Sequence, residues 1–349
     1  MSIPEQYQAF RRTTGETPSS IEKSIERNPK DLHPEDVLIR VHAVSLNFRD
    51  VAMLHGRYPV EVEKQGIPAS DAAAEVVAIG SAVTDFKIGD RAAPIFDLNN
   101  LNGDEEDATR ILGGDVSGVL REYAVFDQNV LVHLPKGMSW EEASTINCAG
   151  VTAWNALRMP NIVGKDKAAL LEGTGGVSMF ALFICLAAGI RPIITSSSDE
   201  KLHEIRNLAP EGTIGTINYK THTDLVPEVL RLTDGKGVDI VVNNVGPSSL
   251  ADNVKCLRRR GTVSLVGFLG GVSGAQDPEV ILGVLMKTAH IQGIGVGSKK
   301  DFQNLNQFLE EKSLRIHSII DRTFSFDDSK AAFDYLYSGK HKGKVVIKI

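Results

Sequence analysis

The sequence of 349 residues predicts an α/β protein with two domains, a β-rich one built from both chain ends and an inserted one with a doubly wound parallel sheet. Three observations predict this arrangement. Short runs of alternating apolar and polar residues, separated by turn residues, fill positions 1–135. From position 167 onward, strand-like and helix-like segments alternate, which is typical of a parallel sheet covered by helices. The last segment, 325–349, again ends in a strand-like run and matches the first part.

The first part of the chain contains four strand-like runs: Asp36–Val44, Ala73–Ile79, Arg91–Ile95 and Arg121–Phe126. Between them lie turn residues such as Ile88-Gly89-Asp90. The segment Asn99–Thr109 is polar and acidic and has no periodicity, so we expect a surface loop. Ser139 ahead of Trp140-Glu141-Glu142-Ala143 is typical of a helix start.

The stretch Lys167–Ile194 has the pattern of a βαβ unit with a glycine-rich turn. An apolar run, Ala168–Leu171, is followed by Gly173-Thr174-Gly175-Gly176, and an unbroken apolar segment then fills 177–188. We expect a strand, a tight turn and a buried helix that is too short to span a membrane. Glycines in such a turn let the backbone approach a pyrophosphate, which the free N–H groups of the helix start can bind. The same turn also occurs for packing reasons alone.

The strands expected for the parallel sheet are Ala168–Leu171, Pro192–Thr195, Thr216–Tyr219, Val238–Asn243, Thr262–Val266 and Ile291–Val296, with helices between them. The tail adds a helix, Ser329–Tyr337, and a last strand, Gly343–Ile349. The basic run Arg258-Arg259-Arg260 precedes Gly261, and we interpret it as a solvated helix end, where cations interact favourably with the helix dipole.

Composition and charge exclude several classes of protein. The formal net charge of −6 argues against nucleic acid or an anionic membrane as a main partner. No segment is long and apolar enough to span a bilayer, and the first residues lack the apolar core of a signal peptide. The three cysteines, at 148, 185 and 256, are too widely spaced for a metal-binding pair or a disulfide framework. These features predict a cytoplasmic protein in a reducing environment.

Several motifs occur in the order in which one known family carries them: SLNFRD, GRYP, PASDAAAEVVAIG, FKIGDR, GGDVSGVLREYAV, CAGVTAW and GTGGVS. In these motifs, over nearly its whole length, the chain resembles the medium-chain dehydrogenase/reductase superfamily. It looks most like the zinc-independent branch, close to quinone oxidoreductases and alcohol-dehydrogenase-like reductases. The resemblance implies a GroES-like catalytic domain at 1–149 and 297–349, and a Rossmann dinucleotide-binding domain at 150–296.

The resemblance also implies where a metal would be bound. Zinc-dependent relatives have a Cys where this chain has Asn47, a Gly-His-Glu where it has Ala69-Ser70-Asp71, and a Cys that matches Cys148. An amide, a hydroxyl and one thiol do not make a zinc site, and the region 95–115 contains no Cys for the structural zinc lobe of those relatives. We therefore expect no metal and interpret Cys148 as a packing residue. A less favoured alternative is a site made of Asp71, Cys148 and a histidine such as His55.

Without a metal, hydride transfer needs other donors for the developing oxyanion. Tyr58 matches the tyrosine that related enoyl reductases use near the substrate carbonyl, so it is the candidate acid; otherwise it is a wall of the cleft. By resemblance Asn47 faces the same site, where it would hydrogen-bond the nicotinamide ribose or the substrate; otherwise it is a turn residue that caps its own backbone. Arg49 and Asp50 are expected to pair with each other.

The cofactor preference is inferred from the end of the second strand of the parallel sheet. NAD-specific proteins place an acid there, about 20 residues after the first glycines, to bind the ribose hydroxyls. Here the strand ends in Ser196 and Ser197, Lys201 follows one helical turn later, and Ser197 with Glu200 has the spacing of a capping box. Hydroxyls and a lysine favour a 2′-phosphate, so we expect NADP(H). In relatives a tyrosine at the position of Tyr219 lies against the adenosine phosphate.

Further cofactor contacts are expected at the carboxyl ends of the strands. The glycine-rich turn and the helix start provide Thr174, Gly175, Gly176 and Val177. By resemblance, the residues around the nicotinamide and its ribose are Asn244, Val245, Gly267, Phe268, Val296, Gly297 and Ser298. The alternative for each glycine is a role in the loop turn only.

Together these features predict a zinc-independent, NADPH-dependent oxidoreductase for a small molecule, acting on an activated C=C bond of an enone or quinone, or on a carbonyl. The alternatives are a metal-free alcohol or aldehyde dehydrogenase and a protein that binds NADPH without catalysis. The last strand of the parallel sheet, 291–296, would expose an apolar edge. Because two subunits of relatives join at this edge, we expect a homodimer.

Overall fold

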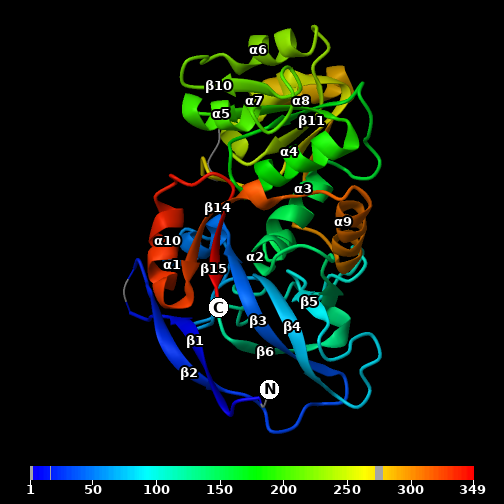
Figure 1. Cartoon of the computed structure of the whole chain (residues 1–349). Coiled ribbons are helices and arrows are strands. Elements are labelled where there is room, and N and C mark those ends of the chain that lie inside the picture. Colours follow the sequence, from blue (N-terminus) through cyan, green and yellow to red (C-terminus); the bar gives the residue numbers. More distant parts are fainter. Residues whose placement is uncertain (1–2, 16, 272–277) are drawn as a thin grey trace. The chain divides into compact units, whose positions relative to one another are not determined.

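The computed structural model describes residues 3–15, 17–271 and 278–349 of the chain. The chain divides into two compact units (Figure 1). The first unit comprises Met1–Val151 and Gly297–Ile349, and the second comprises Thr152–Val296. Both chain ends therefore belong to the first unit, and each unit has a sheet and a hydrophobic core of its own.

The first unit is mainly β-structure, as the sequence predicted. In its described residues, a sheet of seven strands has the order β14-β15-β3-β4-β5-β7, β6 also pairs with β3, and β1 and β2 form a separate ladder. All neighbours pair antiparallel except β14 and β15. The strands are β1 (Gln6–Arg12), β2 (Ile21–Arg27), β3 (Asp36–Leu46), β4 (Asp71–Ile79), β5 (Arg91–Pro94), β6 (Tyr123–Asp127), β7 (Leu131–His133), β14 (Ile320–Ser325) and β15 (Lys344–Lys348).

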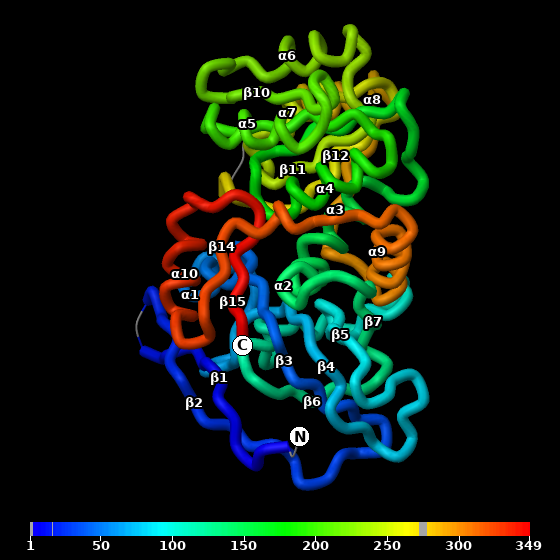
Figure 2. The backbone as a smooth tube through the Cα atoms, viewed as in Figure 1, coloured from blue at the N-terminus to red at the C-terminus, as the bar shows by residue number. Residues whose placement is uncertain are grey.

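The last strand closes this sheet. In Figure 2 the red strand β15 lies beside the blue strand β3, and Val345 pairs with Leu46 at the end of the ladder. Alternate residues of the central strands point into one core, since side chains along a strand alternate between the two faces of a sheet. The core residues from β3, β4 and β15 include Val37, Ile39, Val41, Ala72, Ala74, Val76, Val345 and Ile347.

Helix α2 of the first unit begins with the side-chain cap that the sequence indicates. At the start of α2, Ser139 Oγ accepts from the Glu142 N–H at 3.0 Å and the Glu142 carboxylate accepts from the Ser139 N–H at 2.9 Å, so the predicted helix start is confirmed. Segment 99–109 contains no helix or strand, in agreement with the expected loop. The helical segments are α1 (Phe48–Leu54), η1 (Gln128–Val130), α2 (Trp140–Ala143), η2 (Ile146–Gly150), α3 (Val151–Ala156, which reaches into the second unit), α9 (Lys299–Glu311), η4 (His317–Ile319), η5 (Phe326–Asp328) and α10 (Ser329–Tyr337).

The second unit has the predicted doubly wound sheet. Six strands within its described residues are parallel throughout and have the order β10-β9-β8-β11-β12-β13. The strand order reverses between β8 and β11, which is the place where such sheets bind nucleotides. The strands are β8 (Ala168–Leu171), β9 (Arg191–Ser196), β10 (Gly215–Asn218), β11 (Val238–Asn243), β12 (Leu257–Leu265) and β13 (His290–Gly293).

Helix α4 (Gly176–Ala188) is the buried helix that the apolar run predicted. Its residues from Ser178 to Cys185 are buried, and Gly189 ends it in the left-handed conformation with φ 73°. The other helical segments of this unit are α5 (Asp199–Arg206), α6 (Leu225–Leu232), η3 (Pro247–Ser249), α7 (Leu250–Cys256) and α8 (Pro278–Lys287). Nowhere in the described ranges is a helix both long and apolar enough to cross a membrane.

Two local expectations were wrong. Arg258-Arg259-Arg260 does not end a helix but lies in β12, where the register with β11 shifts and the arginines bulge toward solvent. Arg258 Nη1 bonds Asp239 Oδ1 at 3.1 Å, and Arg260 has φ 67°. The predicted strand 291–296 is shorter in the structure, where β13 comprises His290–Gly293. Val296 has φ 64°, which a strand does not allow.

Candidate functional site

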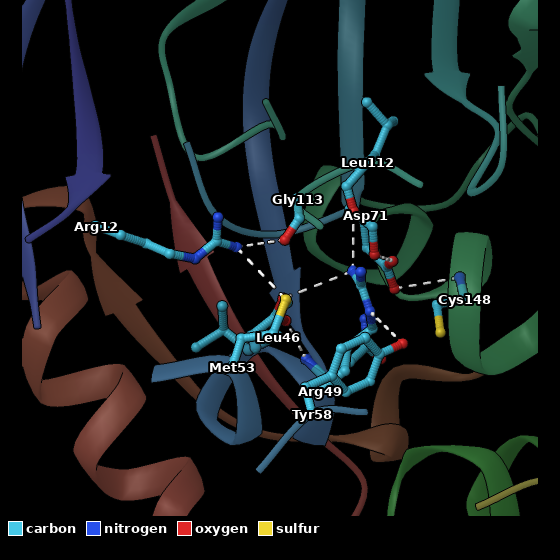
Figure 3. Close-up of polar contacts among 12 residues, drawn as sticks. Arg12, Leu46, Arg49, Met53, Tyr58, Asp71, Leu112, Gly113 and Cys148 are labelled. Atoms are coloured by element: carbon cyan, nitrogen blue, oxygen red, sulfur yellow. Dashed lines mark hydrogen bonds and ion pairs between the residues drawn. The ribbon is translucent and has the colours of Figure 1, made fainter. Parts of the chain in front are cut away.

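A group of buried and half-buried polar side chains lies in the first unit where β3, β4 and β15 meet α1 (Figure 3). We call it the polar cluster, and its members are Asn47, Arg49, Asp50, Tyr58, Ser70, Asp71, Cys148 and Lys344. It contains the two candidate catalytic residues and the residues at the positions where zinc-dependent relatives hold their metal. The cluster is therefore the candidate chemical site of this unit.

Arg49 holds Tyr58 in place. Its guanidinium donates from Nη1 to the Leu112 carbonyl at 2.9 Å and from Nε to the Tyr58 hydroxyl at 3.4 Å. Figure 3 shows it between these two residues. The guanidinium carbon also lies 5.4 Å from the Tyr58 ring centroid and 4.9 Å from that of Phe96. Arg49 Nη1 and Asp50 Oδ1 are 4.0 Å apart, so the expected ion pair between them is confirmed.

Asn47 lies at the N-cap of α1, and Asp50 Oδ2 accepts from its backbone N–H at 2.8 Å. Its side-chain oxygen contacts a residue from the far end of the chain. Lys344 Nζ donates to Asn47 Oδ1 at 2.6 Å and to the Leu46 carbonyl at 2.8 Å, and it lies 3.6 Å from Asp71 Oδ2. Lys344 is 2% exposed and Asp71 is completely buried. The structure thus places a buried ammonium between Asn47 and Asp71.

Asp71 also fixes the neighbours on its other side. Ser70 Oγ donates to Asp71 Oδ1 at 2.6 Å, and the Cys148 backbone N–H donates to Asp71 Oδ2 at 3.3 Å. Burial, together with the Asp71 carboxylate, raises the pKa of the Cys148 thiol to about 12, so the sulfur is protonated at neutral pH. Asp71, Ser70 and Cys148 therefore form one hydrogen-bonded group.

These donors do not fit a zinc ion. A catalytic zinc site needs three ligands that are thiolates, imidazoles or carboxylates. Here an amide, a hydroxyl and one thiol stand at the positions in question, and the Lys344 ammonium lies 3.6 Å from the Asp71 carboxylate. Among the residues that the structure describes, no group of three His, Cys, Asp or Glu side chains is arranged to hold a metal.

Lys344 was not identified from the sequence. The available signal is a lysine at the start of Val345-Val346-Ile347, a run that forms a fully buried strand. A lysine in such a strand needs an oxygen-rich partner, because a charged group is not buried without one.

The second unit contains the glycine-rich turn between β8 and α4. Gly173 has φ 78°, and a Cβ placed on Gly173 or Gly175 would meet no atom within 4 Å, so the space in front of the turn is open. The Gly173 N–H donates to Thr195 Oγ1 at 3.0 Å. Thr174, Gly176 and Val177 complete the turn and the first turn of α4, whose backbone N–H groups have no acceptor inside the helix. This geometry fits the diphosphate of a dinucleotide.

The ends of β9 and β10 bring together the residues expected at the 2′-phosphate. The Tyr219 N–H donates to the Ser196 carbonyl at 3.1 Å, and both Ser197 and Tyr219 are exposed. The expected capping box of Ser197 with Glu200 is wrong by one residue. Ser198 caps α5, and its Oγ accepts from the Lys201 N–H at 3.3 Å.

The ends of β8, β11 and β12 form a connected polar network. Asn244 Nδ2 donates to the Glu172 carbonyl at 3.1 Å and to Ser178 Oγ at 3.0 Å, and the Val245 N–H donates to Glu172 Oε2 at 3.4 Å. The Gly267 N–H donates to the Asn243 carbonyl at 3.3 Å, so the loop with Phe268 lies beside residues 243–245. The structure therefore brings Asn244, Val245, Gly267 and Phe268 together at the strand ends, and their contacts with a cofactor stay a prediction.

Glu172 is a second residue that the sequence reading missed. Burial raises the pKa of its carboxyl, and Asn253 Nδ2 donates to its Oε1 at 2.7 Å. Its signal is an acid that stands between the apolar run Ala168–Leu171 and the glycine-rich turn.

The remaining predicted cofactor residues lie where the chain leaves the parallel sheet. The Val296 carbonyl accepts from Asn155 Nδ2 at 2.8 Å. Ser298 caps α9, accepting from the Asp301 N–H at 3.1 Å and donating to Asp301 Oδ2 at 2.8 Å. The contacts of Val296, Gly297 and Ser298 with a cofactor stay a prediction.

Comparison with known families identifies both units. Residues 33–136 match the family described as "Alcohol dehydrogenase GroES-like domain", and residues 176–311 match the one described as "Zinc-binding dehydrogenase". The first match contains β3 to β7, and the second begins at α4 and continues through β13 to α9.

Individual proteins match over nearly the whole chain. A zinc-type alcohol dehydrogenase-like protein of Schizosaccharomyces pombe is 39% identical over 326 residues, covering 92% of this chain and 93% of that protein. A quinone oxidoreductase of Pseudomonas aeruginosa is 31% identical over 330 residues, covering 91% and 93%. The crystal structure of a putative alcohol dehydrogenase from Sinorhizobium meliloti is 31% identical, with a TM-score of 0.89 over 100% of both chains.

The state of the Cys148 thiol gives the first prediction. With its pKa at about 12, only about one thiol in ten thousand is ionised at pH 8, because a thiol is tenfold less ionised for each pH unit below its pKa. Iodoacetamide at pH 8 should therefore leave Cys148 almost unmodified in the native protein, as measured by peptide mass mapping. The rate should rise about tenfold per pH unit, as far as the fold survives.

The denatured protein at the same pH is the control, because its thiols return to their ordinary pKa of about 8.5 and should react. Rapid modification of Cys148 in the native protein at pH 8 would contradict a protonated thiol.

Proposed function

Because the chain belongs to the medium-chain dehydrogenase/reductase superfamily and is an oxidoreductase of that family, we propose that it is a metal-independent, NADPH-dependent reductase of small molecules. The proposed substrate carries an activated C=C bond, as in an enone or a quinone, and a carbonyl substrate is the alternative. One observation carries the proposal: neutral donors and an ammonium occupy the positions where relatives hold a metal, next to a tyrosine held by Arg49.

The proposed reaction balances as the transfer of a hydride and a proton. When bound at the strand ends of the second unit, NADPH would supply the hydride, and the substrate would take up one proton to complete the reduction. Tyr58 donates a hydrogen bond to the carbonyl oxygen as negative charge develops there. The Tyr58 oxygen accepts from Arg49 Nε at 3.4 Å, and a phenol that accepts one hydrogen bond can also donate one.

The preference for a C=C bond follows from the donors. Carbonyl reduction in this superfamily usually uses a zinc ion as Lewis acid, and the donors of the polar cluster do not fit one. A metal-free alcohol or aldehyde dehydrogenase is the second candidate, which the names of the relatives favour. A protein that binds NADPH without catalysis is the third.

The choice of NADPH over NADH rests on the ends of β9 and β10. No acid stands at the end of β9, and the nearby Asp199 accepts from Asn218 Nδ2 at 2.8 Å. Ser196, Ser197, Lys201 and Tyr219 would bind the 2′-phosphate. One similar solved structure, 26% identical with a TM-score of 0.83, is an NAD-dependent alcohol dehydrogenase, so NADH is the alternative to test.

The test of this function is NADPH oxidation against a panel of enones, quinones, aldehydes and ketones, with metal analysis of the same sample. We expect turnover of enones or quinones that a chelator does not abolish, and less than one zinc per chain. Stoichiometric zinc together with activity lost to a chelator would refute metal independence. Tight NADPH binding without turnover on the whole panel would favour the non-catalytic alternative.

Lys201 tests the cofactor preference. Lys201→Ala should weaken NADPH binding by about 1–3 kcal/mol, because a charge-assisted hydrogen bond to the 2′-phosphate is lost, and should leave NADH binding unchanged. The measurement is titration calorimetry with both cofactors. Lys236→Ala is the matched control. This exposed lysine lies just before the N-terminal end of β11, whereas the proposed cofactor residues lie at the C-terminal ends of the strands. Equal losses for the two cofactors would count against the assignment.

Tyr58 tests the proton donor. Tyr58→Phe should lower kcat by about tenfold to a thousandfold, the range for losing one acid or oxyanion donor. NADPH affinity should hardly change, since the proposed cofactor residues belong mainly to the second unit. Tyr337→Phe, the same change on an exposed tyrosine stacked on His55, should leave kcat as it is. Full kcat in the Tyr58 variant would make this residue only a wall of the cleft.

A homodimer is the proposed assembly. Strand β13 is an edge of the parallel sheet, and next to it in the chain α8 exposes apolar side chains, with Ile281 at 75% and Leu285 at 72%. Such a surface favours pairing with a second copy.

Light scattering at micromolar concentration should give twice the chain mass, and the double variant Ile281→Asp with Leu285→Asp should give the mass of the monomer. Val163→Asp, an exposed site elsewhere, should remain dimeric; a monomeric wild type would overturn the assembly.

Location and partners stay proposals as well. The free thiols of Cys148, Cys185 and Cys256 fit the reducing cytoplasm proposed from the sequence. No partner other than the small-molecule substrate and a second copy of the chain is proposed.

A further inference from the structure

The buried ammonium of Lys344 has a well-defined set of oxygens around it. Nζ is 2.6 Å from Asn47 Oδ1, 2.8 Å from the Leu46 carbonyl and 3.6 Å from Asp71 Oδ2. An ammonium has three hydrogens to donate, and a buried charge needs such partners in place of water. The Leu46 carbonyl belongs to β3 and Asp71 is held by Ser70 and Cys148, so the position of Nζ is determined by the strands.

This ammonium determines which way the Asn47 amide faces. An ammonium only donates, so the carbonyl oxygen of the amide, and not its NH₂ group, must face Lys344. The Nδ2 atom then points away from Lys344. It is buried and has no acceptor in the part of the chain that the structure describes. A buried donor without a partner is costly, and natural structures keep few of them. An acceptor from a bound molecule would satisfy it.

The same stretch of chain presents the proposed proton donor. Asn47 caps α1, Arg49 lies two residues later, and Arg49 Nε holds the Tyr58 hydroxyl at 3.4 Å. Residues 47–58 therefore supply an amide donor and a phenol. Two preorganised donors are the usual arrangement for stabilising an oxyanion.

We propose that Lys344 is a positioning residue, which fixes the Asn47 amide so that its Nδ2 hydrogens are presented to the carbonyl oxygen of the substrate. The inference rests on the proposed function and deepens it: Asn47 is the second donor beside Tyr58. Lys344 itself does not touch the substrate and acts through Asn47.

The competing explanation is that Asn47 only caps α1. Asn47→Asp separates the two, because Asp caps a helix as well as Asn does and its carboxylate would still accept from Lys344. The variant keeps the cap and loses the NH₂ donor. We expect kcat to fall about tenfold to a thousandfold, with the melting temperature and NADPH affinity retained. Unchanged kcat would overturn the proposal, as would a loss confined to NADPH affinity, which would assign the amide to the cofactor.

A double-mutant cycle tests whether Lys344 acts through Asn47. Lys344→Met removes the ammonium while keeping a long side chain. It should lower kcat about tenfold or more in the wild-type background and less than about twofold in an Asn47→Ala background, since coupled residues are not additive. Equal losses in both backgrounds would make Lys344 merely structural and overturn the proposal.

A readout that does not depend on turnover separates this proposal from the proposed function. In protein labelled with ¹⁵N-asparagine, the side-chain NH₂ signal of Asn47 is identified by its loss in Asn47→Asp. Lys344→Met should shift or broaden that signal, and an unmoved signal would overturn the inference. If the signal moves but no acceptor on the panel is reduced, the proposed function fails while the orientation of the amide by Lys344 stands.

Removing Lys344 alone leaves Asp71 as a buried charge, which can prevent folding. If Lys344→Met does not fold, Lys344→Met with Asp71→Asn removes both charges, and the same NMR signal and the same kinetic cycle are measured on it. The expected and overturning results are those given for Lys344→Met.

Discussion

The pairing of the last strand with β3 is the constraint on which the first unit depends. Val345 pairs with Leu46, and Ser45 pairs with Asp71 on the neighbouring strand β4. Because β15, β3 and β4 are adjacent, Lys344, Leu46 and Asp71 arrive at the same end of the sheet. A lysine and an aspartate that would each be costly to bury alone become acceptable together, as each supplies the other's counter-charge.

The second unit is organised by a different constraint. In a parallel sheet all strands end at the same edge, so residues far apart in sequence meet there without special contacts. The glycine-rich turn, the Ser196–Tyr219 bond, the Asn244 network and the Gly267 loop all lie at such ends. This is why a reading of the strand ends groups these residues together, while their contacts with a cofactor stay a prediction.

The polar cluster shows how the side chains at one place in a fold can differ in chemistry between relatives while the fold stays the same. Where zinc-dependent relatives provide a metal, this chain provides a localised positive charge on a side chain, bonded to an amide. Three oxygens surround the Lys344 ammonium. A catalytic metal ion, in contrast, keeps one coordination position open for the substrate. In the proposed reaction, stabilisation of a developing oxyanion depends on neutral donors, whose orientation matters more than their charge.

The sequence by itself determined the α/β class, the βαβ unit, most strand and helix bounds and the Ser139 cap. These features depend on residues close together in the chain or on a single position. Some local readings were wrong where tertiary contacts overrode them, as when a register shift placed Arg258–Arg260 in β12. Only the tertiary structure decided that Lys344 faces Leu46, 298 positions away, and that Glu172 bonds Asn253. No local pattern carries such information, because these partners are chosen by strand pairing and by the need to satisfy buried charge and polar groups.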